Sequence, residues 1–436
     1  SYLLIGSFSF RRLISNSEVT ILPSQILFFI MFTSGLVNFI LFICSDLILD
    51  NFTNNVSGRH ISLFLIDELD QSLFFQVHLF FIIFLFVLSL LFFREAHIKK
   101  INLNLLEVFE NKFDKHVQRK LLFTLVILLL LSPIKIKFYI FYDAALLIIV
   151  SLIIFWVSQV DHLRDLIMRM IISLFSLSIL LILVPYLMNF SENKLLLHFE
   201  RGAFINSTIV LFTFSYFYMS LLTRRVLIIM TLFFLFILIS VFLLDVLQGF
   251  TEFSQYLLLE KFIKFNYVFE HTIFRNAAVV LDSLKNSNMY LNGHSYVTAL
   301  YGLIPFTGIE RGLSNHVVEV YENLLLRKIN GGMASGLIVE GIINFGVYFG
   351  AVFTSFVISI ILYLVDHLYS IHKKSILHFL LAIYSISLIY AVFRYDLAIL
   401  FRKIEYGLVL VIIIYLVYFL VSKIEVRLNK NKNDKF

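Results

Sequence analysis

The sequence predicts an all-α polytopic membrane protein with about ten transmembrane helices and one large structured outside (periplasmic) loop containing amphipathic helices. Three observations predict this fold class. Apolar residues make up 60% of the 436 residues, and mean hydropathy is +0.92, unlike an ordinary soluble domain. Apolar runs recur at about the 20-residue length that a helix needs to cross a bilayer. The basic residues lie between these runs, so membrane topology explains the net charge of +6 better than nucleic-acid binding does.

Ten apolar segments form the predicted spans. The third is short and ends before Pro133, and the third and fourth can also be read as one interrupted segment. The segments are Ser24–Leu47, Ser72–Phe93, Leu121–Ser132, Phe138–Val157, Leu166–Met188, Ala203–Leu222, Val226–Val246, Ile338–Val365, Ile376–Phe393 and Tyr406–Val421.

The distribution of positive charge predicts the orientation of the spans. With the N-terminus in the cytoplasm, 20 of the 35 Lys and Arg residues fall on the cytoplasmic side and eight in short outside loops. Such a bias is typical of multi-pass proteins, so both termini are expected in the cytoplasm. The chain then divides into residues 1–246 with about seven spans, a large loop 247–335, residues 336–423 with about three spans, and a basic cytoplasmic tail 424–436.

The outside loop, with about ninety residues, is far longer than the usual connection between helices, and such loops are often functional. Apolar residues at helical spacing predict an amphipathic surface helix over Phe250–Ile273, and a second helix is expected over Arg275–Lys285. A turn is expected at Asn292–Gly293. The amphipathic rings of Tyr290, Tyr296 and Tyr301 suit a membrane interface or the face of a sugar.

A glycine-rich stretch, Asn330–Gly346, joins this loop to the eighth predicted span and carries the carboxyl group of Glu340. A carboxylate at membrane depth is costly, so it usually faces a cavity or a partner rather than lipid. The neighbouring glycines permit the close packing or bending that a re-entrant or broken helix requires. Glu340 is therefore the first candidate for chemistry.

Three arginines are expected on the same outside face as Glu340. Arg275, Arg394 and Arg402 could bind an anion, because guanidinium groups grip phosphate bidentately. The alternative is that Arg394 pairs with Asp396, or Arg402 with Glu405, in purely structural contacts. The spacing of His, Asp and Glu matches no metal site, and the single cysteine excludes an intramolecular disulfide.

Segments near the end of the loop carry a family resemblance. They are Tyr290–Tyr296 (YLNGHSY), Glu340 with Asn344–Gly346 (NFG), and Arg394–Asp396 (RYD). Together they resemble the bacterial O-antigen or oligosaccharide repeat-unit polymerases, the Wzy family, over roughly Arg275–Arg402. Where that family often has Glu-Ala-Tyr, this chain has Glu-Gly-Ile after residue 339.

The resemblance implies a metal-independent membrane glycosyltransferase with no cofactor. Such an enzyme joins O-antigen repeat units, carried on undecaprenyl diphosphate, at the periplasmic face of the bacterial inner membrane. The expected partners are these lipid-linked oligosaccharides, membrane lipid and a chain-length regulator protein, without nucleic acid. Glu340 and His294 would be catalytic, and the substrate would be bound by residues that include Tyr296, Asn344 and the three arginines Arg275, Arg394 and Arg402.

Two other functions stay open at this point. An O-antigen ligase would have the same architecture and is poorly separated from a polymerase by sequence. A flippase or other transporter of the lipid-linked oligosaccharide belongs to a different class. Such exporters typically have short loops, so the long structured loop favours an enzyme.

The charge bias makes the topology testable. A reporter enzyme that is active only in the periplasm should be active when fused after Asn292, and inactive when fused after Lys374 or Lys432. A cytoplasmic signal from the fusion at Asn292 would reverse the orientation and move the candidate site to the other face.

Overall fold

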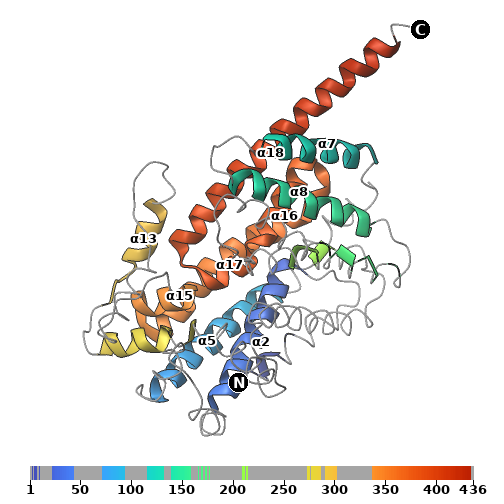
Figure 1. Cartoon of the computed structure of the whole chain (residues 1–436). Helices are drawn as coiled ribbons and strands as arrows, with labels where there is room; N and C mark the ends of the chain where they lie inside the picture. Colours follow the sequence, from blue (N-terminus) through green and yellow to red (C-terminus); the bar gives the residue numbers. More distant parts are fainter. Residues whose placement is uncertain are drawn as a thin grey trace, which may run out of the picture.

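Every described element of the computed structural model is a helix (Figure 1). The structure describes residues 22–43, 71–93, 115–131, 139–158, 273–274, 276–285, 290–301 and 336–433, together with isolated residues in 2–9, 165–176 and 209–214. The main helices are α2 (Pro23–Ile43), α5 (Gln71–Phe92), α7 (Lys115–Leu131), α8 (Tyr139–Ser158), α13 (His294–Tyr301), α15 (Gly336–Ser370), α16 (Ile376–Ser387), α17 (Ile389–Arg394) and α18 (Leu397–Asn433).

Within the described residues, three helices are long and apolar enough to cross a membrane: Ser72–Phe92, Gly336–Ser370 and Leu397–Arg427. Shorter apolar helices lie at Pro23–Leu36, Leu147–Val157 and Ile376–Ser387. The predicted spans over Leu166–Met188, Ala203–Leu222 and Val226–Val246 fall largely outside the described residues, as does the predicted surface helix Phe250–Ile273. The membrane character is therefore supported, while the number of spans stays a prediction.

Helix α15 is broken within the predicted eighth span Ile338–Val365, as the glycines around Glu340 permit. Gly346 has φ 71° and ψ −166°, which separates a first segment, residues 336–345, from a second, residues 347–370. Ten residues span only about 15 Å as a helix, too short to cross a bilayer. The second segment has exposed apolar side chains every fourth residue, at Phe356, Ile360 and Leu364, as expected of a helix with one face in lipid.

The break brings the two segments of α15 together. A Cβ built on Gly350 would lie 2.8 Å from the carbonyl carbon of Gly341, and one built on Gly341 would lie 2.9 Å from the ring of Phe80. Only glycine allows backbones to approach so closely. The glycines thus have the close-packing role that the sequence indicates, and they seat the short segment against α5.

The bundle has its core where the second segment of α15 runs along α5 (Figure 1). Phe80, Phe81 and Phe84 of α5 are fully buried, and the Ser355 hydroxyl on α15 donates to the Phe84 carbonyl over 3.3 Å. The helix predicted over Arg275–Lys285 is present at residues 273–285, apart from Arg275, which is not described. It is largely buried, and its Phe274 ring lies 5.1 Å from the ring of Phe81.

Near the C-terminal end of α15, the buried carboxylate of Asp366 links two helices. Asp366 is fully buried and accepts a hydrogen bond from the backbone N–H of Ser24 (3.0 Å) and another from its hydroxyl (2.5 Å). Ser24 lies in the first turn of α2, where backbone N–H groups lack partners within the helix. The carboxylate therefore fixes the start of α2 to the end of α15.

Helix α18 begins nine residues before the span predicted at Tyr406–Val421, so Arg402 lies in a helix rather than in a short outside loop. It also continues to Asn433, and most of the predicted tail 424–436 is an extension of the same helix. At 1.5 Å per residue its 37 residues span about 55 Å. Its two ends therefore lie on opposite sides of any bilayer that it crosses.

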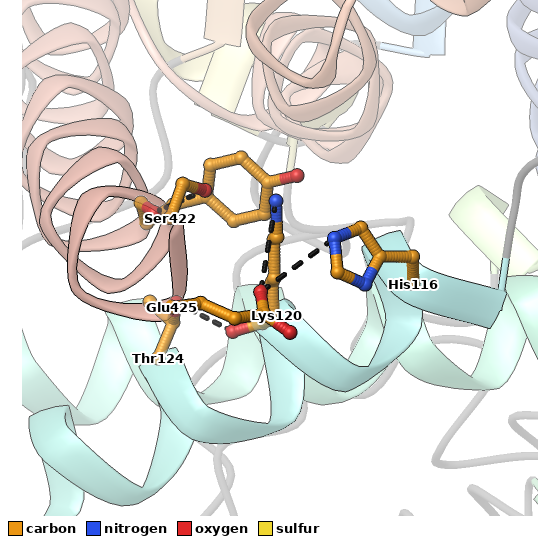
Figure 2. Close-up of polar contacts among 6 residues, drawn as sticks. His116, Lys120, Thr124, Ser422 and Glu425 are labelled. Atoms are coloured by element: carbon orange, nitrogen blue, oxygen red, sulfur yellow. Dashed lines mark hydrogen bonds and ion pairs between the residues drawn. The ribbon is translucent and has the colours of Figure 1, made fainter. Parts of the chain in front are cut away.

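The far end of α18 meets the basic start of α7. The Glu425 carboxylate lies 3.6 Å from His116 Nε2 and 3.8 Å from Lys120 Nζ (Figure 2). Such partly exposed pairs contribute about 0–1 kcal/mol each. The pairs place the basic start of α7 beside the basic end of α18, at one end of the bundle.

The first residues of the chain also pack into the bundle, which the sequence did not predict. Tyr2 is buried, and its hydroxyl lies 3.2 Å from Nδ1 of His78 on α5. Its ring lies 5.7 Å from the ring of Phe39 on α2. The predicted cytoplasmic position of the N-terminus remains a prediction.

Replacing Gly350 by Ala tests the contact between the two segments of α15. The added methyl group would press on the backbone of Gly341, and such overpacking costs about 1–3 kcal/mol, more than the helix propensity that Ala adds. Thermal unfolding of the purified protein should show a lower Tm. The exposed Ile360→Ala on the same helix serves as the control, and equal Tm values for the two variants would contradict the contact.

Candidate functional site

The candidate site begins with the carbonyl groups that the break in α15 exposes. A helix end leaves its last carbonyls without partners inside the helix. Here the backbone N–H groups of Leu291 and Asn292 donate to the carbonyls of Ile343 (3.0 Å) and Asn344 (3.2 Å). The segment before α13 therefore docks on the end of the short helix, residues 336–345.

The turn predicted at Asn292–Gly293 is present and allows this docking. Asn292 has φ 47° and Gly293 has φ 87°, two successive left-handed conformations that asparagine and glycine tolerate best. The Gly293 N–H then donates to Oδ1 of Asn344 over 2.9 Å. The turn thus places His294 and Ser295, the first residues of α13, beside the broken helix.

Asn344 organises the polar contacts at the break. It is fully buried, and its side-chain amide donates to the Ser295 hydroxyl oxygen (2.6 Å) and to the Glu340 carbonyl (2.7 Å). Its side-chain oxygen accepts from the Gly293 N–H. Both N–H donors of the amide and one of its two oxygen lone pairs are therefore used. The residue holds the loop, the serine and the short helix in one arrangement.

The Glu340 carboxylate joins three parts of the chain. Its Oε1 accepts from the Ser295 hydroxyl of α13 and its Oε2 from the backbone N–H of Leu397, the first residue of α18, each over 2.8 Å. Glu340 is only 1% exposed. A buried carboxylate needs such partners, because an unpaired one would be strongly destabilising.

The start of α18 also stabilises the negative charge of Glu340. Asp396 precedes the helix and accepts from the Ile399 N–H over 2.8 Å, which is the usual N-cap arrangement. Glu340 occupies another of the unpaired N–H groups, that of Leu397. The positive end of the helix dipole favours negative charge here, and it offsets part of the repulsion between two neighbouring carboxyl groups.

Tyr296, the residue after Ser295, is a packing residue. Its ring is stacked 6.0 Å from the ring of Phe345 and edge-on to that of Phe353 at 5.1 Å. Burial, helped by the nearby Glu340 charge, raises the pKa of the Tyr296 phenol far above its ordinary value, although a hydrogen bond with Thr354 opposes the shift. The phenol therefore stays protonated, and its ring is not open to a sugar in this conformation.

Of the other predicted site residues, the structure describes the side chains of His294 and Arg402. The His294 side chain is exposed, and its Nδ1 lies 3.3 Å from the Thr298 hydroxyl on the same helix. Arg402 is exposed on α18. Arg275 and the side chain of Arg394 lie outside the described residues, so the anion site remains a prediction.

Sequence reasoning missed two groups that touch Glu340. Ser295 lies within the segment Tyr290–Tyr296 that carries the resemblance, but a serine in a polar loop has no signal of its own. The Leu397 N–H could not be predicted, because the start of α18 was placed too late. The exposed rings of Tyr290 and Tyr301, in contrast, fit the interfacial positions expected from the sequence.

Comparison with known proteins adds no family assignment: no protein-family model, no curated protein and no solved structure matches the chain. In the part of the chain that the structure describes, no group of three or more His, Cys, Asp and Glu residues is placed to hold a metal ion. The described site brings together the buried carboxyl groups of Glu340 and Asp396, the Ser295 hydroxyl and the Asn344 amide.

Replacing Asn344 by Ala tests whether this amide holds the loop. The variant would leave the partly buried Gly293 N–H without its acceptor, which costs about 1 kcal/mol. We expect a lower Tm and faster hydrogen exchange of the amides in residues 291–297. Thr298→Ala, which removes an exposed hydrogen bond in the same helix, should change neither measurement. Unchanged exchange in Asn344→Ala would contradict the role of the amide.

Proposed function

We propose that the protein is a membrane glycosyltransferase that joins undecaprenyl-diphosphate-linked oligosaccharide repeat units. The observation that carries the proposal is Glu340, a buried carboxyl group on a broken helix that contacts the end of the large loop. Ionisable groups at membrane depth are most often functional. Two of the three segments that carry the resemblance, Tyr290–Tyr296 and Glu340 with Asn344–Gly346, also pack against each other.

The expected reaction suits a site of this kind. A sugar diphosphate is already a good leaving group, so the enzyme needs cations to hold it and a base to take the acceptor proton. Glu340 is the proposed base and His294 the alternative. Arg275, Arg394 and Arg402 are the proposed diphosphate ligands, because the guanidinium fork matches phosphate oxygens. The scheme needs no metal.

The position of the site within the bundle agrees with this assignment. Glu340 contacts the start of α18, whereas Lys120 of the basic start of α7 contacts Glu425 near the other end of that helix. If the basic end is cytoplasmic, the carboxyl group lies near the periplasmic face of the inner membrane. Lipid-linked repeats would be joined there, with a chain-length regulator protein as a further proposed partner.

A transporter of the same lipid-linked oligosaccharide is the second candidate. The break at Gly346 favours it specifically, because discontinuous helices form the substrate sites of many transporters. Those sites, however, lie near the bilayer midplane, between two matching broken helices. Glu340 instead contacts the first residue of a long spanning helix, which favours an enzyme working at one face.

Glu340→Gln tests the catalytic role directly. The amide keeps the size of the side chain and can still accept from Leu397, but it cannot take a proton. We expect the rate of polymer formation by the purified protein to fall by about 10²–10⁴ with protein level unchanged. Polymer formation at the wild-type rate would remove Glu340 as the base, and a reduced protein level with normal specific activity would assign it a structural role.

Cells that lack the protein separate the three functions. Loss of a polymerase leaves the lipopolysaccharide core capped with a single repeat, and loss of a ligase leaves the core without O-antigen. Loss of a flippase leaves no O-antigen at the cell surface. The proposed function requires the single-repeat result.

A further inference from the structure

Burial limits how Glu340 can act as a base. Its side chain is 1% exposed, and both carboxylate oxygens already accept a hydrogen bond, from Ser295 and from Leu397. A general base must come within about 2.6–3.2 Å of the atom whose proton it takes, or act through one intervening group. In the described conformation, a sugar hydroxyl therefore has no direct path to this carboxyl group.

Ser295 provides the intervening group. It is partly exposed, unlike Glu340, and it lies in the first turn of α13 at the end of the large loop. Its hydroxyl donates to Glu340 Oε1 over 2.8 Å, and its oxygen accepts from the Asn344 amide over 2.6 Å. A hydroxyl oxygen has two acceptor lone pairs, so these contacts leave one for a further donor.

The Asn344 amide fixes the direction of the serine proton. An amide N–H can only donate, so the Ser295 oxygen must accept from it and cannot donate back. The hydroxyl hydrogen is then directed to the carboxylate rather than to Asn344. A second donor that approaches the remaining lone pair would complete a chain from substrate to serine to Glu340.

We infer that the Ser295 hydroxyl is a catalytic residue that contacts the acceptor sugar and relays its proton to Glu340. This inference rests on the proposed function. The acceptor O–H bond breaks and its proton passes to Ser295 Oγ, while the original Ser295 proton passes to Glu340 Oε1. The acceptor oxygen forms a bond to the anomeric carbon of the donor sugar, and the bond from that carbon to the diphosphate breaks. The diphosphate leaves with the electron pair.

The test measures transfer by the purified full chain, with undecaprenyl-diphosphate-linked oligosaccharide from the source cells as the probe. Ser295→Ala should lower kcat by about 10²–10⁴ with little change in KM. Ser295→Thr retains a hydroxyl at the same place and should restore most of the rate. Thr298→Ala, one turn further along α13, is the matched control and should keep the wild-type rate.

The double variant Ser295→Ala/Glu340→Gln distinguishes a relay from loosened structure. Groups that act as one unit are not additive, so the double variant should be no slower than the slower single variant. If the kcat losses of the two single variants multiply in the double variant, the relay is overturned. It is also overturned if Ser295→Ala keeps wild-type kcat while Glu340→Gln is inactive. Failure of Ser295→Thr to recover activity, at wild-type Tm, would also overturn it. If the wild-type protein itself transfers no sugar, the proposed function fails instead, and the relay fails with it.

Discussion

The Glu340 carboxylate, held between Ser295 and the backbone of Leu397, is the interaction on which the described arrangement depends. Removing a carboxylate from water costs several kcal/mol even after the protein relaxes. Two hydrogen bonds to a charged group, each contributing about 1.5–3 kcal/mol, and the start of a helix offset that cost. Because these partners come from α13 and α18, burying the charge on α15 requires all three segments to be in place.

A second constraint explains why the loop docks at this point. The break at Gly346 shortens the first segment of α15 and leaves carbonyl groups at its end without partners inside the helix. The N–H groups of Leu291 and Asn292 satisfy them. The break, the left-handed turn at Asn292–Gly293 and the buried amide of Asn344 therefore act together. They fix the segment before α13 beside a buried carboxyl group.

The sequence predicted the features that depend on composition and local pattern. Long apolar runs predicted α2, α5 and α8 to within a few residues at each described end, and a lone carboxylate among glycines identified Glu340. The sequence also predicted the Asn292–Gly293 turn, because few residues adopt left-handed conformations easily. These signals are local, so they need no knowledge of which helices become neighbours.

The errors have equally physical causes. The charged residues between Arg394 and Glu405 suggested a loop, but long basic side chains can extend from a helix end toward water, and Asp396 caps α18 before them. The partners of Glu340 depend on residues 45 and 57 positions away in the chain, which no local pattern reveals. Tyr296 was expected at a surface, yet its ring completes a buried aromatic cluster with Phe345 and Phe353.

A double-mutant cycle on unfolding free energy tests the central claim, that Ser295 and Glu340 hold each other in the folded protein. The cycle compares Ser295→Ala, Glu340→Gln and the double variant with the wild type. The geometry predicts a coupling energy of about 1–3 kcal/mol between the two positions, as expected for a buried hydrogen bond to a charged group. Effects that add to within about 0.5 kcal/mol would contradict the account, because independent sites behave in that way.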